Sequence, residues 1–445
     1  MTRAIRRAAL IRLQIALLAS LATALILLGT PDALAASNTI TQPDNGGLYT
    51  SIQLDSSGFP VVSHYDPVVH QLKVVHCGDA YCSSGNTVAS PDPTSMTMVG
   101  HTSLALAGNT PVVTHYDSGP RDLKLVHCGN ATCSTPTVRA LDSGMTDNVG
   151  IYGSIAINSS GDPVIAYYYE PTDTLKLIVC NDAICNSYSR QTVDSNAIRG
   201  GYPSLALDAS GFPVISYYDQ SNADLDVVHC GNATCSMGNT IVSPDGLFGD
   251  VGKYTSLRLD AAGFPVVSYY DETGGNLKVL HCGDANCLSG NVIRTPDSTG
   301  TVGLHTSLAL DGAGNPVVSY YSATSSLLKV LHCGDSTCTG GNTITTPDSS
   351  TSAGQYTSLA LDSAGNPVVS YYDAIGKLSV LHCGDPTCTG TSAAVGGLTE
   401  LTGALIRRRE HSSAYPAIAS GLLLATAIVI CLRIAGSKTR SRGRS

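Results

Sequence analysis

Tryptophan is absent from the 445 residues of the chain, and phenylalanine occurs only four times. Charged residues make up 13% of the sequence, against about 25% in a typical soluble domain. So little charge excludes a charge-rich disordered chain and a long coiled coil. Glycine (45 residues) and tyrosine (21 residues) are plentiful instead, which is typical of a protein rich in turns and strands.

Basic residues are scarce in the body of the chain. Residues 37–396 contain 13 Lys and Arg against 31 Asp and Glu, a net charge of −18. A body this acidic repels a phosphate backbone, so no nucleic-acid partner is expected. Nearly all the acids are aspartates in turn-like contexts, which indicates turn formation before acid catalysis.

The N-terminal 36 residues have the three parts of a secretory signal. Four arginines precede an apolar run over 13–28, and Ala33-Leu34-Ala35 follows as a small-x-small cleavage site. The sequence therefore predicts a signal peptide over 1–36, with an uncleaved membrane anchor as the alternative.

A second apolar run covers 414–432 and holds no charge over 19 residues. At about 1.5 Å per residue it is long enough to cross a hydrocarbon core of about 30 Å. We expect a linker over 397–413, a transmembrane helix over 414–432 and a basic cytoplasmic tail over 433–445, with a buried core helix as the alternative. The chain is then a single-pass protein of the cell membrane, with residues 37–396 outside the cytoplasm.

Internal repeats dominate these extracytoplasmic residues. The phrase Leu-Asp-x-x-Gly-x-Pro-Val-Val-Ser-Tyr-Tyr-Asp recurs seven times at intervals of 50 to 52 residues. Its proline stands at Pro60, Pro111, Pro163, Pro213, Pro265, Pro316 and Pro367.

Each repeat predicts four strands, as in the last copy at 356–362, 367–372 and 378–383, with the fourth strand represented by 341–348 of the copy before. Asp362 and Gly365 occupy the first and fourth positions of a type I turn, so the first two strands form a tight hairpin. Seven four-stranded copies predict an all-β, seven-bladed β-propeller over 37–396. No fourth strand is evident after the last copy. Residues 37–44 match the missing strand and are expected to close the last blade as its outer strand.

Fourteen of the fifteen cysteines form seven pairs with the spacing Cys-x4-Cys, one pair in each repeat. A regular, even set in an exported chain predicts seven local disulfides. They are expected to pin the blade edges rather than to build the core. The pairs are Cys77 with Cys82, Cys128 with Cys133, Cys180 with Cys185, Cys230 with Cys235, Cys282 with Cys287, Cys333 with Cys338 and Cys383 with Cys388.

No metal or cofactor is expected. A histidine precedes the first cysteine in six repeats, but neighbouring residues on a strand point to opposite faces. Each Asp-x-x-Gly turn offers one carboxylate, whereas calcium takes six to eight oxygens. The sequence also contains no phosphate-binding loop and no His-Glu-x-x-His motif.

These short Asp-Gly hairpin repeats resemble the secreted bacterial seven-bladed β-propellers, whose architecture is similar to that of Asp-box and WD-repeat propellers. The signatures Ser-x-Asp-x-Gly-x-Thr-Trp and Trp-Asp do not occur in the sequence. The resemblance therefore implies an architecture and no functional residues.

The Tyr-Asp dipeptide that ends the second strand leads into the face where propellers usually bind ligands. We predict a ring of these side chains as the ligand site, with packing between blades and turn capping as the alternative. The ten residues are Tyr65, Asp66, Tyr116, Asp117, Tyr218, Asp219, Tyr270, Asp271, Tyr372 and Asp373. If one part of the ring is special, the irregular second and third repeats are the expected place.

Near-identity of the repeats argues against a single catalytic centre, so no catalytic residue is predicted and the protein is not expected to be an enzyme. We expect a monomeric cell-surface binding or adhesion module with a glycan or protein ligand. The lack of tryptophan, a preferred platform for sugars, weakens the glycan version. The alternatives are a hydrolase or lyase of envelope polysaccharide, and a structural envelope spacer.

Overall fold

The computed structural model describes residues 37–93, 99–143, 148–195, 199–246, 249–350 and 352–394. The predicted signal peptide, linker, transmembrane helix and tail lie outside these ranges and stay predictions. Within the described ranges, no helix has the length and apolar character needed to span a bilayer.

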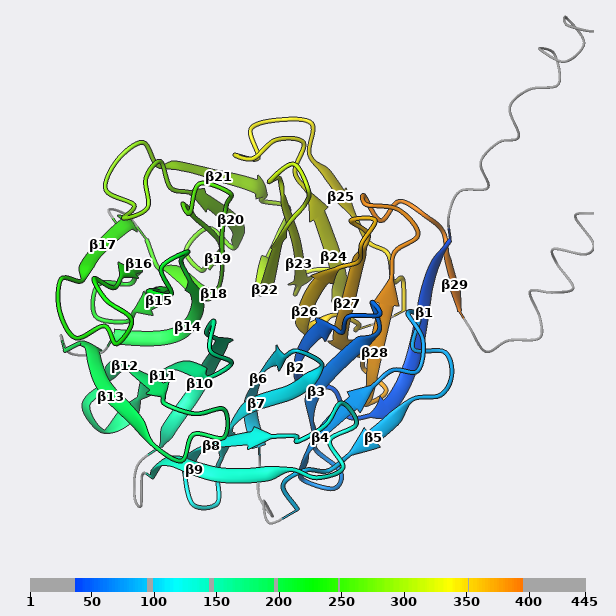
Figure 1. The fold of residues 1–445 in the computed structure, drawn as a ribbon. Coiled ribbons are helices and arrows are strands. Elements are labelled where there is room, and N and C mark those ends of the chain that lie inside the picture. Colours follow the sequence, from blue (N-terminus) through cyan, green and yellow to red (C-terminus); the bar gives the residue numbers. More distant parts are fainter. Residues whose placement is uncertain are drawn as a thin grey trace, which may run out of the picture. The chain divides into compact units, whose positions relative to one another are not determined.

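Seven antiparallel sheets confirm the predicted seven-bladed β-propeller. Figure 1 shows the sheets arranged around a central axis, with the first strand of each blade nearest the axis. In blades 1 to 6 the four strands are neighbours in chain order.

The blades divide the chain into segments of similar length. Blades 1 and 2 contain β2 (Leu48–Leu54), β3 (Pro60–Asp66), β4 (Gln71–His76), β5 (Thr87–Ala89), β6 (Val99–Ala107), β7 (Thr110–Asp117), β8 (Asp122–His127) and β9 (Thr137–Ser143). Blades 3 and 4 contain β10 (Val149–Ile157), β11 (Pro163–Tyr169), β12 (Thr174–Cys180), β13 (Tyr188–Asp194), β14 (Arg199–Leu207), β15 (Pro213–Asp219), β16 (Asp224–His229) and β17 (Thr240–Asp245), with a short 3-10 helix η1 (Glu170–Thr172) after β11. Blades 5 and 6 contain β18 (Val251–Leu259), β19 (Pro265–Asp271), β20 (Asn276–His281), β21 (Val292–Asp297), β22 (Val302–Leu310), β23 (Pro316–Ser322), β24 (Leu327–His332) and β25 (Thr343–Thr345).

Blade 7 joins the two ends of the repeat region. It contains β26 (Gln355–Leu361), β27 (Pro367–Tyr372) and β28 (Lys377–His382), and β28 pairs with β1 (Asn38–Asn45). The predicted closure by the N-terminal strand is confirmed. The expectation that no strand follows the last copy was wrong, because β29 (Ser392–Ala394) lies beyond β1 as a fifth strand. β1 is therefore an inner strand of blade 7 and has partners on both sides.

The predicted hairpin turn has the expected hydrogen bonds. In the last repeat the Gly365 amide donates to the Asp362 carbonyl at 2.9 Å. The Asp362 carboxylate accepts from the amides of Ala364 and Asn366 at 2.8 Å each and contacts His382 Nε2 at 2.9 Å. Four other blades repeat the His-Asp contact, so these histidines, which precede the first cysteine of each pair, anchor hairpins.

The core consists of seven apolar clusters, each between two neighbouring blades. All seven predicted disulfides are present. Every one of their cysteines is at most 3% exposed, and the seven disulfides belong to these clusters. The disulfides therefore form part of the core, which corrects the expectation that they only pin blade edges.

Glycine permits the close approach of adjacent blades. Gly303 in β22 has φ +97°, and a Cβ atom there would lie 2.7 Å from the Leu277 Cα of the preceding blade. A side chain is thus excluded both by conformation and by contact with backbone.

Candidate functional site: the aromatic collar of the channel

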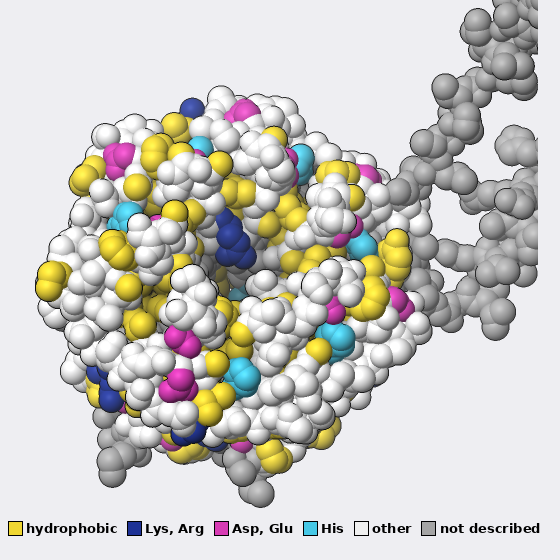
Figure 2. Space-filling view, viewed as in Figure 1, with side chains coloured by type: hydrophobic (Ala, Val, Ile, Leu, Met, Phe, Trp, Pro, Cys, Tyr) yellow, Lys and Arg dark blue, Asp and Glu magenta, His cyan; other side chains and the backbone are white. Residues whose placement is uncertain are grey.

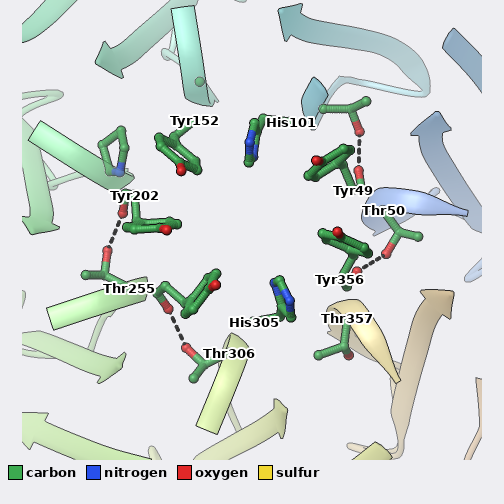
Figure 3. Close-up of a pocket in the computed structure, with 14 residues that line it drawn as sticks. Tyr49, Thr50, His101, Tyr152, Tyr202, Thr255, His305, Thr306, Tyr356 and Thr357 are labelled. Atoms are coloured by element: carbon green, nitrogen blue, oxygen red, sulfur yellow. Dashed lines mark hydrogen bonds between the residues drawn. The ribbon is translucent and has the colours of Figure 1, made fainter. Parts of the chain in front are cut away.

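Seven aromatic side chains surround one end of the central channel, one from the start of each first strand. They line a cavity of about 190 Å³ (Figure 3). We call this set the aromatic collar; it consists of Tyr49, His101, Tyr152, Tyr202, Tyr254, His305 and Tyr356.

The collar is a closed ring of touching side chains. Centroids of neighbouring rings lie 4.1–4.6 Å apart in all seven contacts, and the planes are tilted by 42–60°. Seven centroids at this spacing lie about 5 Å from the axis, which is an upper limit on the radius of the opening because the rings and hydroxyls extend inward from their centroids.

All seven collar residues have a left-handed backbone conformation, with φ between +49° and +58°. Glycine and asparagine adopt this region readily, whereas a bulky residue there is an outlier that costs about 1–3 kcal/mol. The ladder register shifts at this point, for example between Lys253 and Ser256. These irregularities accompany the left-handed residue, and each collar side chain faces the cavity.

Threonines hold the backbone of the collar in place. The hydroxyl of Thr255, which follows Tyr254, donates to the Tyr202 carbonyl of the preceding blade at 2.8 Å. Thr50, Thr102 and Thr306 repeat this contact at 2.7–2.8 Å (Figure 3). Gly153 and Pro203 take the threonine position in blades 3 and 4. The collar is therefore supported less regularly there.

A second set of hydrogen bonds joins all seven blades one residue further on. In each pair of neighbours, a first-strand serine accepts the amide of the next blade's first strand at 2.9–3.3 Å, as Ser256 accepts from Leu308. Serine is the residue between threonine and leucine in the repeat. It fixes each first strand to the next.

Burial disfavours the charged form of the two collar histidines. Burial lowers the pKa of His101 to about 3 and that of His305 to about 4. Burial raises the pKa of Tyr356 to about 12, with further contributions from Tyr49. The described lining of this cavity contains no Asp or Glu. The collar presents aromatic faces and hydroxyls rather than a general acid or base.

The ten residues predicted as the ligand ring lie elsewhere. Tyr65 pairs with Leu48, so these dipeptides lie at the collar end of the blades but one strand further from the axis. None of the ten lines the collar cavity. Two of the tyrosines contact the next blade: the Tyr116 hydroxyl donates to the Asn148 side chain, and Tyr65 lies in the apolar cluster between blades 1 and 2.

The five predicted aspartates are buried and serve their own turns. The Asp219 carboxylate accepts from the Ser221 amide at 2.8 Å and pairs with Arg199 at 2.9 Å. The other four accept backbone amides of the following turn at 2.8–3.2 Å. Their oxygens are thus occupied by the blade itself, as the turn-capping alternative describes.

The sequence contained a signal for the collar. Tyrosine or histidine stands two residues before the first-strand serine in all seven copies, in contexts such as Tyr-Thr-Ser and His-Thr-Ser. The alternating pattern treats this residue as the start of a regular strand. The left-handed turn that directs it into the channel is not visible in that pattern.

No family model matches the chain, and no curated protein matches it. Solved structures with a similar arrangement include the polysaccharide lyase Uly1, at 8% identity and a TM-score of 0.48, covering 76% of this chain and 89% of the lyase. An α-L-arabinofuranosidase from Fusarium graminearum has 12% identity and a TM-score of 0.43, with 64% and 92% covered. The SapL1 lectin, in complex with alpha methyl fucoside, has 9% identity and a TM-score of 0.42, with 68% and 97% covered. None of these likenesses bears on the ligand of this chain.

Proposed function

We propose that the chain is a membrane-anchored, extracytoplasmic binding module whose ligand is taken up at the aromatic collar. The first candidate ligand is a surface glycan, and the alternative is a protein segment. The observation that carries this proposal is the set of seven bulky aromatic residues in a left-handed conformation, all half-buried with surface open to the channel.

The left-handed conformation is informative because other residues adopt it at a lower steric cost. Asparagine or glycine would satisfy the same backbone without the steric cost, yet every blade has tyrosine or histidine. Strained residues that persist around a cavity support a functional role for that cavity. Aromatic faces with hydroxyls beside them suit a ligand that has both apolar C–H faces and hydroxyl groups, as a sugar does.

Binding without turnover is the version we favour. Most glycoside hydrolases use a pair of carboxyl groups about 5–10 Å apart, and the described collar lining has no carboxylate. The polysaccharide hydrolase or lyase and the structural spacer remain the competing proposals. The seven disulfides are compatible with an oxidising compartment outside the cytoplasm.

The test uses the full chain, oxidised and reconstituted in lipid nanodiscs, on an array of glycans and envelope polysaccharides, with product release measured in parallel. Retention without product is the expected result. Product release would replace the binding proposal by the enzyme proposal. Silence on the array would favour the protein ligand or the spacer.

A pair of variants assigns any retained glycan to the collar. Tyr254→Asn removes the aromatic face but suits the left-handed backbone, so we expect binding to weaken tenfold or more while the melting temperature stays equal or rises. Tyr254→Phe keeps the face and is expected to keep most of the affinity. A lower melting temperature of Tyr254→Asn with unchanged binding would show that the collar only stabilises the ring.

A further inference from the structure

The other end of the channel has a pocket of its own, with a volume of about 410 Å³. It lies where the first strands end, next to the hairpins that lead into the second strands. We call it the hairpin-end pocket. Its walls are leucine and alanine side chains, and its two polar residues are Arg258 and Gln53. Figure 2 shows the central hollow of the ring, with basic side-chain atoms inside it.

Arg258 breaks the sevenfold pattern at the position that faces the channel. It follows the serine and leucine of the first strand in β18. The equivalent residue is alanine in five of the other six blades and glutamine in blade 1. These residues are Gln53, Ala105, Ala156, Ala206, Ala309 and Ala360.

The positive charge of Arg258 has no counter-charge within the described residues. Its Nη1 donates to the Leu257 carbonyl at 2.7 Å, which uses one of five N–H donors. No described carboxylate lies within ion-pair distance of it, whereas Arg199 contacts Asp194, Asp219 and Asp226 at 2.9–3.2 Å. Burial lowers the pKa of Arg258, yet a guanidinium stays charged in proteins.

The walls of the pocket indicate which chemical groups could lie beside the guanidinium. Leu54, Leu259, Leu310 and Leu361 are half-buried and keep apolar surface open. The surface of the pocket is polar and apolar in similar parts, and a concave site with a few convergent polar groups is the usual form of a small-molecule site. The Gln53 amide lies in the same pocket and offers two further donors.

We propose that the hairpin-end pocket binds an amphiphilic carboxylate, with the guanidinium of Arg258 receiving the carboxylate and the leucines receiving the apolar body. Guanidinium and carboxylate pair through two parallel N–H···O bonds, which gives this pocket a preference for a planar oxyanion. Two sources have this chemistry: a short fatty acid and the C-terminus of a peptide that ends in an apolar residue.

This site is independent of the collar. The two pockets share no lining residue, and Arg258 and Tyr254 lie four residues apart on β18, at most about 13 Å along the strand. A ligand in one pocket therefore leaves the other free, and failure of the glycan proposal leaves this one intact.

The experiment measures binding of hexanoate and N-acetyl-leucine by calorimetry to the full chain in nanodiscs, with empty nanodiscs subtracted. Hexanol tests the apolar body without charge, and acetate tests the charge without the body. We expect saturable binding of one or both carboxylates, and binding at least tenfold weaker for hexanol and acetate. Stronger binding of hexanoate assigns the fatty acid, and stronger binding of N-acetyl-leucine assigns the peptide terminus.

Arg258→Ala tests the role of the guanidinium with little risk to the fold, because it gives blade 5 the residue that five other blades have. We expect an unchanged melting temperature and a loss of carboxylate affinity of tenfold or more, with partial retention in Arg258→Lys. Tyr254→Asn should leave carboxylate binding unchanged. Equal carboxylate affinity in Arg258→Ala and the unmodified chain, or no carboxylate binding at millimolar concentration, would overturn the proposal.

Discussion

Each blade has one buried aromatic side chain that contacts an aspartate of the blade before it. The hydroxyl of Tyr320, for example, donates to the Asp297 carboxylate at 2.7 Å, and both side chains are buried. In blades 1 and 2 a histidine replaces the tyrosine. The seven pairs are Asp44 with His64, Asp92 with His115, Asp142 with Tyr167, Asp194 with Tyr217, Asp245 with Tyr269, Asp297 with Tyr320 and Asp348 with Tyr371.

Blade 4 arranges the charges around this contact differently. Lys278 in blade 5 pairs with Asp245 at 2.9 Å, but the equivalent residue in blade 4 is Asp226. The cation comes instead from Arg199, which contacts Asp194 and Asp226. Burial raises the pKa of Asp226 to about 6, although the Ser243 hydroxyl and Arg199 act in the opposite direction.

This raised pKa predicts a pH-dependent stability. Asp226 binds its proton more tightly in the folded state than in the unfolded chain. The stabilisation of the folded state that results is fully present below about pH 4 and is lost as pH rises through about 6. We expect the free energy of unfolding of the parent to fall by about 1–3 kcal/mol over this pH interval, and Asp226→Asn to abolish that fall. Denaturant unfolding of both proteins from pH 4 to 8 measures the difference between the two profiles. Parallel profiles would contradict the prediction.

At the scale of the element, the disulfide hairpin forms part of the interface between blades. Cys282 and Cys287 lie in the apolar cluster that contains Val214 and Leu225 of blade 4 and Leu280 of blade 5. The covalent bond closes a short loop, and the sulfur atoms fill apolar space. The loop closure and the packing therefore contribute separately to the free energy of unfolding.

We expect the double substitution Cys282→Ala with Cys287→Ala to lower the free energy of unfolding by about 2 kcal/mol through chain entropy. Lost packing should add a further decrease, because both side chains are buried. Unfolding in the presence of a reductant isolates the packing part, since the disulfide is then absent from both proteins. A variant as stable as the parent under oxidising conditions would contradict this account.

Regular elements were predictable from the sequence because their patterns are local. The proline interval, the Asp-x-x-Gly turn at 362–365 and the Cys-x4-Cys spacing are each read within one repeat. The collar was not predicted, because Tyr254 and its equivalents enter the channel through a left-handed residue that breaks the strand alternation. Arg258 was also not predicted, because the repeat pattern indicated blades 2 and 3, whereas the residue that interrupts the channel symmetry belongs to blade 5.

At the scale of the whole molecule, contacts of one side chain reinforce the ladder between β1 and β28 that closes the ring. Asn38 is fully buried; its Nδ2 donates to the Gly390 carbonyl at 2.6 Å, and its Oδ1 accepts the Gly384 amide at 2.9 Å. Asn342 makes the equivalent contacts in blade 6, with Gly334 and Cys338, but within one continuous stretch of chain. The same asparagine contacts thus join the two chain ends in blade 7 and only neighbouring residues in blade 6.

We expect Asn38→Ala and Asn342→Ala to lower the free energy of unfolding by similar amounts, about 1–3 kcal/mol. Only Asn38→Ala should also increase amide exchange in β28 and β1, because it weakens the joint between the two chain ends. Hydrogen exchange followed by mass spectrometry distinguishes the two variants. Identical exchange in blade 7 would mean that the closure does not depend on this residue.

Because β1 pairs with β28, the first strand of the propeller is synthesised long before its partner strand. Thr41 contacts Val380, 339 residues later, so at 5–20 residues per second β1 waits about 20–70 s before its partner strand exists. Throughout that interval β1 lacks its partner strand, and the β28 of a neighbouring chain offers the same hydrogen-bonding edge. We expect two copies produced side by side at high expression to exchange their first strands and form strand-swapped dimers, and dilute synthesis to give single closed rings.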